Sequence, residues 1–70
     1  MSRKTISRKA NNIVKRLTND GLVKVRNQLH NDKEFNILLN DIYNILDDKG
    51  LLHTTLSFST CECVIALVRE

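Results

Sequence analysis

The segment from Leu51 to Val68, LLHTTLSFSTCECVIALV, decides the fold class, because its apolar side chains alternate instead of following a helical spacing. Two sets of opposite parity occur in it, Leu52, Thr54, Leu56 and Phe58 in the first and Cys61, Cys63, Ile65 and Leu67 in the second. A straight strand cannot place both sets on one face, whereas a hairpin that turns at residues 59–60 can. The segment therefore predicts a C-terminal antiparallel β-hairpin.

The alternation also predicts the register of the hairpin. The expected pairs are Phe58 with Cys61, Leu56 with Cys63, Thr54 with Ile65, and Leu52 with Leu67. Ser59-Thr60 lacks the Gly or Asn that favours a tight turn, so a bulge in one long strand is an alternative. The opposite face of the last strand carries Val64, Ala66 and Val68. Because this apolar strip would otherwise face solvent, we predict that it forms a homodimer interface.

Residues 31–50 predict a helix that packs against the core. Asn31 is a suitable N-cap, and Glu34 stands three residues later, as in a capping box. Apolar residues follow at helical spacing, namely Phe35, Leu38, Leu39, Ile42, Ile45 and Leu46. Gly50 predicts the end of the helix, because glycine is favoured just past a helix C-terminus.

The N-terminal part predicts an amphipathic basic helix. Its apolar residues recur at helical spacing, namely Ile6, Ala10, Ile13, Val14 and Leu17, and either Thr5 or Ser7 can cap it. Asn19-Asp20-Gly21 is a turn signal, so we expect the helix to break there. A short second helix from Leu22 to Leu29 would then bury Leu22, Val25 and Leu29 and expose Lys24 and Arg26. Without the break, the first two helices would be one.

The predicted fold class is therefore α+β, with two or three N-terminal helices followed by a C-terminal antiparallel β-hairpin. We expect residues 1–5 to form a flexible basic arm and residues 6–70 a single small domain. The element order resembles that of winged-helix domains, with residues 49–52 leading into the wing. The helix that reads the major groove in such domains is here acidic and Asn-rich, which implies that DNA contacts come from the first helix and arm.

Charge is divided unequally along the chain. Eight of the 11 basic residues and one acid, Asp20, precede residue 27, which gives this part a net charge of +7. The remainder carries three basic and seven acidic residues, a net charge of −4. Clustered positive charge attracts polyanions. We therefore predict a nucleic-acid-binding surface formed by Arg3, Lys4, Arg8, Lys9, Lys15, Arg16, Lys24 and Arg26.

Patterns that support catalysis or metal binding are absent from the sequence. A chain with two glycines has no Gly-rich phosphate loop and no nucleophile elbow, so we expect no enzymatic activity and no cofactor. Cys61 and Cys63 form C-x-C instead of the C-x-x-C of zinc knuckles, so we expect no metal and two reduced, at least partly buried thiols. We find no secretory signal and no bilayer-spanning apolar run, and we expect a cytoplasmic protein that binds no membrane.

These features predict a small non-enzymatic binding protein. Our first hypothesis is a regulator that binds nucleic acid, most simply duplex DNA without sequence specificity, through its basic arm and helix. The alternative is a small protein-interaction module, such as a phage-type inhibitor or adaptor of a host protein, because an apolar hairpin and an acidic helix also suit docking. The small size of the core favours a homodimer.

Overall fold

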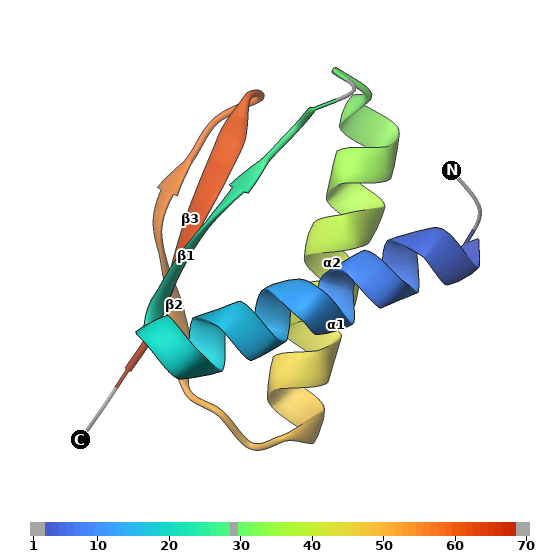
Figure 1. Cartoon of the computed structure of the whole chain (residues 1–70). Helices are drawn as coiled ribbons and strands as arrows, with labels where there is room; N and C mark the ends of the chain where they lie inside the picture. Colours follow the sequence, from blue (N-terminus) through green and yellow to red (C-terminus); the bar gives the residue numbers. More distant parts are fainter. Residues whose placement is uncertain (1–2, 29, 69–70) are drawn as a thin grey trace.

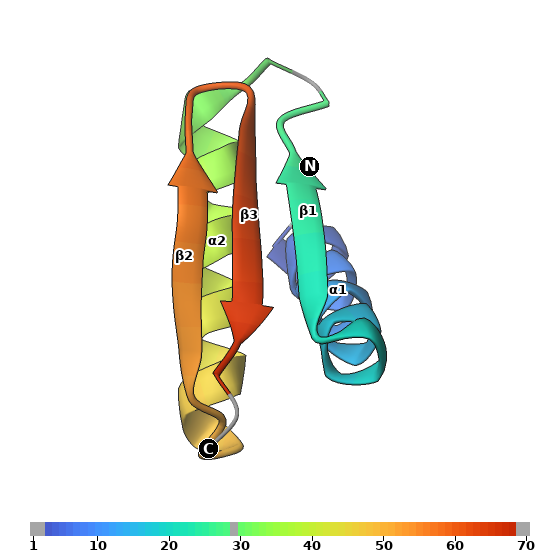
Figure 2. The same ribbon diagram turned by 90° about the vertical axis from the view of Figure 1, so that its left-hand side faces the viewer.

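Two helices cover one face of a three-stranded antiparallel sheet (Figure 1). The structure is a computed structural model, and it describes residues 3–28 and 30–68. The elements are α1 (Arg3–Asp20), β1 (Leu22–Arg26), α2 (Asp32–Asp48), β2 (His53–Phe58) and β3 (Glu62–Leu67). The strand order is β1-β3-β2, and no described helix covers the second face of the sheet (Figure 2). The predicted α+β class is confirmed.

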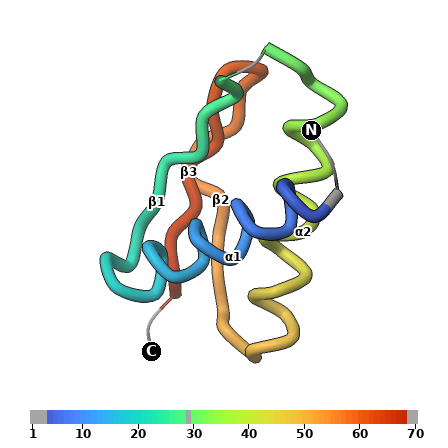
Figure 3. The backbone as a smooth tube through the Cα atoms, turned by 45° about the vertical axis from the view of Figure 1, so that its right-hand side comes forward, coloured from blue at the N-terminus to red at the C-terminus, as the bar shows by residue number. Residues whose placement is uncertain are grey.

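Helix α1 forms where the sequence predicts a basic amphipathic helix. It buries Ile6, Ala10, Val14 and Leu17, while it crosses α2 and runs beside β1 (Figure 3). The helix begins at Arg3, so residues 3–5 of the expected arm are helical, and residues 1–2 lie outside the described residues. The predicted break is confirmed, because Gly21 adopts a φ of 78° and its N–H donates to the Leu17 carbonyl at 2.7 Å.

The segment after Gly21 is a strand, which corrects the predicted second helix from Leu22 to Leu29. In β1 the buried Val23 and Val25 alternate with exposed residues, and Leu22, which we expected in the core, is 48% exposed. The strand pairs antiparallel with β3, with Val23 opposite Ile65. This pairing provides hydrogen-bond partners along one edge of β1, and the strand buries two β-branched side chains, which favour a strand over a helix. Leu29 lies outside the described residues.

Helix α2 agrees with its prediction. The Asn31 side chain caps it by accepting a hydrogen bond from the Glu34 N–H at 3.2 Å. The buried face consists of Phe35, Leu38, Leu39, Ile42 and Leu46. The helix ends at Asp48 with Lys49 as C-cap, and Gly50 follows with a φ of 69°. Both ends are set by residues next to the helix, so they could be recognised from the sequence.

The predicted hairpin is present, but the predicted register is wrong. Thr55 pairs with Ile65 and Ser57 with Val64, so Leu56 is the extra residue of a β-bulge. The turn follows β2 directly, and the Ser59 N–H donates to the Glu62 carbonyl at 2.8 Å. The alternative of one long strand with a bulge at residues 59–60 is therefore wrong, and the bulge that occurs lies within β2. The longer turn shifts the pairing near it by two residues, so that Phe58 lies opposite Cys63, and the bulge reduces this shift to one residue from Thr55 onward.

The bulge and the edge position of β2 also explain which apolar side chains stay exposed. We expected Leu52, Leu56 and Phe58 on the core face, but their exposed fractions are 58%, 59% and 60%. An edge strand has a neighbour on one side only, and here that neighbour is β3. Phe58 still stacks on Phe35, with 6.4 Å between ring centroids. Cys63 therefore lies opposite Phe58, not Leu56.

Asn27 joins three parts of the fold just after β1. Its side chain is buried, and its Nδ2 donates to Asp32 Oδ1 at 3.1 Å and to the Thr60 carbonyl at 3.0 Å. Its Oδ1 accepts from the Asn31 N–H at 3.0 Å. The end of β1, the start of α2 and the hairpin turn are thus held by one amide. Such a group is expected to be fully hydrogen-bonded when buried.

Candidate nucleic-acid interface

The fold places the basic and the acidic residues mainly on different elements. Helix α1 and strand β1 lie against each other and carry the eight basic residues that precede residue 27. Helix α2 lies behind β2 and β3 and carries five acids, Asp32, Glu34, Asp41, Asp47 and Asp48 (Figure 2). The asymmetry along the sequence is therefore also an asymmetry in space, and one side of the molecule presents positive charge.

A groove of about 400 Å³ runs between α1 and β1. Four of the predicted site residues line it, Lys9 and Arg16 from α1 and Lys24 and Arg26 from β1. Its apolar lining consists of Ile13, Val23, Val25 and Leu38, and Asn12 and Gln28 add neutral polar groups. This volume lies within the range of ligand-binding clefts, and the lining combines an apolar floor with cations.

The two helical cations stand on one flank of α1. Lys9 and Arg16 are two helical turns apart, and Asn12 lies between them on the same flank. Lys9 is half-buried, whereas Arg16 and Asn12 are exposed. Because two turns correspond to about 10.5 Å of helix rise, the two charges are spread along the groove instead of meeting at one point.

The two cations of β1 approach the same region from the other side of the strand. Lys24 and Arg26 alternate with the buried Val23 and Val25, so they point away from the helices. Strand β1 is an edge strand, and cations of α1 and β1 therefore flank one sheet edge. The Lys24 Nζ lies 3.9 Å from Glu62 Oε2, but both side chains are well exposed, at 49% and 38%. Such a pair is weak and leaves Lys24 available to a stronger anion.

The remaining predicted cations do not line the groove. Lys4, Arg8 and Lys15 are exposed on α1, and their spacing places them on the side of the helix opposite its buried residues. The side chain of Arg3 lies outside what the structure describes. The structure thus divides the predicted surface into four groove cations and three cations on the adjacent outer side of α1.

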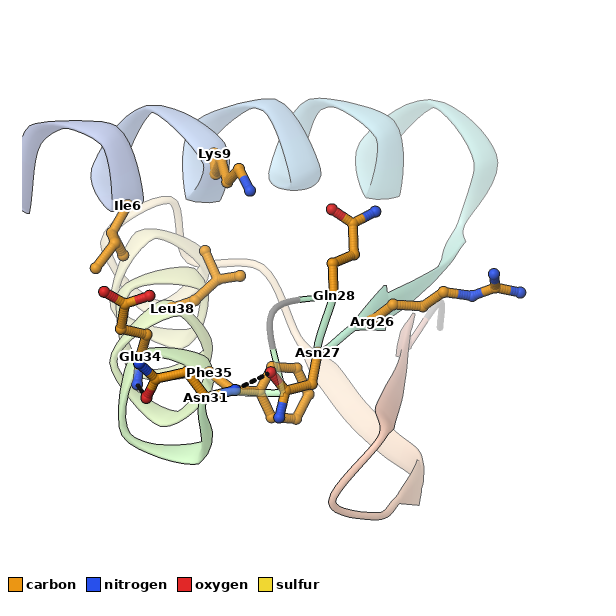
Figure 4. Close-up of a pocket in the computed structure, with 9 residues that line it drawn as sticks. All are labelled: Ile6, Lys9, Arg26, Asn27, Gln28, Asn31, Glu34, Phe35 and Leu38. Carbon is orange, nitrogen blue, oxygen red and sulfur yellow. Dashed lines mark hydrogen bonds between the residues drawn. The ribbon is translucent and has the colours of Figure 1, made fainter. Parts of the chain in front are cut away.

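A smaller cavity of about 30 Å³ lies at one end of the groove, between α1, the end of β1 and the start of α2 (Figure 4). Ile6, Phe35 and Leu38 form its apolar wall, and the Asn27 amide accepts the hydrogen bond from Asn31 beside it. This volume has room for only a few water molecules, so the cavity is too small for an organic ligand. Its polar residues serve the fold.

Sequence reasoning missed Asn12, Asn27 and Gln28. Asn12 and Gln28 line the groove, and Asn27 holds the turn that positions Gln28. A neutral amide does not contribute to the charge pattern. In addition, the sequence predicted a helix from Leu22 to Leu29 where the structure has strand β1, so the proximity of Asn12 and Gln28 could not be predicted.

Tyr43 belongs to a second polar cluster, located between α2 and the hairpin. Its hydroxyl lies 2.7 Å from Thr55 Oγ1 and 3.7 Å from Cys63 Sγ, and its ring stacks on His53. Burial raises the pKa of the Tyr43 hydroxyl, and the Cys63 thiol raises it further, while the Thr55 hydrogen bond acts in the opposite direction. The hydroxyl is therefore protonated at neutral pH and acts as a structural link between α2 and β2.

The two cysteines occupy different environments. Cys63 is fully buried as predicted, whereas Cys61 is exposed, which corrects our expectation that both thiols are at least partly buried. Cys61 belongs to the turn, where no described helix covers it, and Cys63 lies on the face of β3 turned to the helices. Both thiols are free. In the part of the chain that the structure describes, no three His, Cys, Asp or Glu side chains gather into a metal-binding group.

Comparisons with protein-family models, with curated proteins and with solved structures gave no match to this chain. Among the described residues, no helix has the length and apolar character needed to cross a bilayer. The case for a function therefore depends on the charge and geometry of the groove between α1 and β1.

Proposed function

We propose that this protein is a small non-enzymatic regulator that binds nucleic acid, most simply duplex DNA, along α1 and β1. The observation that carries the proposal is the convergence of Lys9, Arg16, Lys24 and Arg26 on one groove, with three further cations on the adjacent side of α1. Contacts from lysine and arginine to phosphates supply most of the affinity in non-specific DNA binding. Of the five acids of α2, Glu34 shares with Lys9 and Arg26 the lining of the small cavity at one end of the groove (Figure 4).

The spacing of the groove cations suits a phosphate backbone. Lys9 and Arg16 are separated by about 10.5 Å of helix rise, which matches the axial rise of about three nucleotides of one strand. One cation can therefore neutralise each of two phosphates on the same strand. Lys24 and Arg26 on β1 provide a second pair about 7 Å apart. Four to six phosphate contacts in total are expected.

Sequence preference is expected to be weak. The cations position the duplex through its phosphates and carry no sequence information. In the groove, Asn12 and Gln28 are the neutral side chains that could reach a base edge. The predicted winged-helix arrangement had up to three helices before the hairpin, whereas two are present, and the helix that precedes the hairpin is acidic. We therefore assign the contacts to α1 and β1 and not to α2.

A salt titration of DNA binding tests the proposal. Each neutralised phosphate adds about 0.9 to the magnitude of the slope of log K against log salt. The double variants Lys9→Ala/Arg16→Ala and Lys24→Ala/Arg26→Ala should each lower this magnitude by about 1.8. The matched control is Lys33→Ala/Lys49→Ala, which removes two exposed cations from the other half of the molecule and should leave the slope unchanged. Equal binding by all three variants, or negligible binding at low salt, would overturn the proposal.

One observation favours the alternative, a protein-interaction module. The groove runs along the unpaired edge of β1, where an extended acidic segment of a partner could add as a fourth strand between the two sets of cations. A polyglutamate peptide distinguishes the two functions. Protein docking becomes the better account if two results are obtained together. The peptide must bind as tightly as a DNA oligonucleotide of equal charge, and Lys24→Ala/Arg26→Ala in β1 must weaken its binding more than Lys9→Ala/Arg16→Ala in α1.

A further inference from the structure

We propose that the uncovered face of the sheet binds a second copy of this chain through an apolar patch of Leu22, Leu52, Val64, Ala66 and Val68. This inference does not depend on the proposed function. It extends the predicted interface of Val64, Ala66 and Val68 by two leucines that come from distant parts of the sequence. The patch lies on the face of the sheet opposite the helices, so it is separate from the core, and it borders Lys24, which also lines the groove (Figure 2).

The backbone brings the five residues together from three neighbouring segments. Leu22 pairs with Ala66 across β1 and β3, and the Leu67 N–H donates to the Gly21 carbonyl at 3.0 Å. On the other side of β3, the Val68 N–H donates to the Leu52 carbonyl at 2.9 Å. The patch therefore spans the full width of the sheet at the end where β3 finishes.

The exposure of these side chains shows that they take no part in the core. Leu22, Leu52 and Val68 are 48%, 58% and 46% exposed, and Val64 and Ala66 are half-buried. In β3 these residues alternate with Cys63 and Ile65, which are fully buried against the helices. Three of the five large apolar side chains that are exposed in the described chain thus gather on one face. A contiguous patch of this kind marks an interaction site more often than scattered exposed residues do.

The charges around the patch are of both signs, as a self-complementary interface requires. None of the five patch residues is charged, but Lys24 lies opposite Val64 on the same face, and Arg26 lies opposite Glu62 in the next row. A polyanion lying across this face would meet the Glu62 carboxylate together with the two cations. In a two-fold dimer, in contrast, the carboxylate of each copy is available to a cation of the other, so the border is self-complementary.

The size of the face sets the expected strength of the dimer. Three strands at a spacing of about 4.8 Å and a length of five to six residues give a flat face of roughly 14 by 20 Å. This is roughly 280 Å², below the approximately 800 Å² per partner of a standard interface, so the dimer belongs to the weak class. We therefore expect a weak dimer that dissociates on dilution.

Sedimentation velocity without nucleic acid tests the inference over a concentration range from about 1 to 200 μM. The wild-type protein should change from monomer to dimer within this range. Leu22→Glu and Val64→Glu should each raise the dissociation constant at least tenfold, while Asn40→Glu, which adds the same charge to an exposed position of α2, should leave it unchanged. A protein that stays monomeric at the highest concentration, or a dimer that both face variants leave intact, overturns the inference.

Cross-linking provides a test that needs no charged residue on the sheet. The variant Ala66→Cys/Cys61→Ser places one accessible thiol at the centre of the patch and removes the exposed native one. Mild oxidation should convert it to a disulfide-linked dimer more than tenfold faster than Asn40→Cys/Cys61→Ser. Equal rates would show that the second copy does not use this face. The two proposals can fail separately. If the wild-type protein forms the dimer but does not bind DNA at low salt, the proposed function is refuted and the dimer inference stands.

Discussion

Replacement of Asn27 by alanine tests how much of the fold depends on one buried amide. Asn27 is 7% exposed, and its side chain makes three hydrogen bonds of 3.0–3.1 Å, to Asp32, Thr60 and Asn31. Alanine would remove all three and leave the Thr60 carbonyl and the Asn31 N–H without their partner. Each of the three lost hydrogen bonds costs about 1 kcal/mol, so we expect a loss of about 2–4 kcal/mol.

That loss is large compared with the roughly 5–15 kcal/mol by which small domains are stable. Urea denaturation followed by far-ultraviolet circular dichroism measures it, and the midpoint should fall while the slope stays the same. Asn40→Ala is the matched control, because Asn40 is exposed on α2 and its replacement should change stability by no more than about 0.5 kcal/mol. A cost for Asn27→Ala no greater than that of the control would refute the reasoning, since the three hydrogen bonds would then contribute nothing.

Two further predictions concern the hairpin. Because the folded pKa of Tyr43 is raised, the unfolded chain loses its proton first, and stability should fall as pH rises from about 10 through the folded pKa. Tyr43→Phe should remove that part of the pH dependence in urea denaturation, and an unchanged profile would contradict the burial of the hydroxyl. In thiol labelling of the native protein, Cys61 should react within the time of a free thiol and Cys63 only on unfolding. Simultaneous labelling of both would show that β3 is not held against the helices.

The helix from Asn31 to Gly50 could be predicted because its signals are local. The cap, the apolar stripe and the terminal glycine all lie within the segment itself. Strand β1 could not be recognised in the same way. The five residues LVKVR fit an alternating pattern and part of a helical one, and the pairing that decides between them joins Val25 to Cys63, far along the chain. The bulge at Leu56 is equally non-local, because it depends on how β2 meets β3.

The basic residues of the candidate site could be predicted from the sequence, but the groove that some of them line could not. The sequence shows that Lys9, Arg16, Lys24 and Arg26 lie in a basic part of the chain. These four residues line one groove because β1 lies beside α1. The sequence pattern predicted a helix in place of β1, so it could not predict the groove. The separation of these four residues from Lys4, Arg8 and Lys15 was likewise visible only in three dimensions.

The central position of β3 has a consequence for how the chain folds. This strand is the last of the described elements in sequence, yet both β1 and β2 pair with it and not with each other. No part of the sheet can therefore form until β3 is present. The pairing of β1 with β3 also closes a long loop that contains α2 and β2, and this closure costs entropy. Contacts between residues far apart in sequence slow folding. We expect the helices to form first, with β1 joining the sheet in the last step, so that the groove between α1 and β1 is complete only when folding is complete.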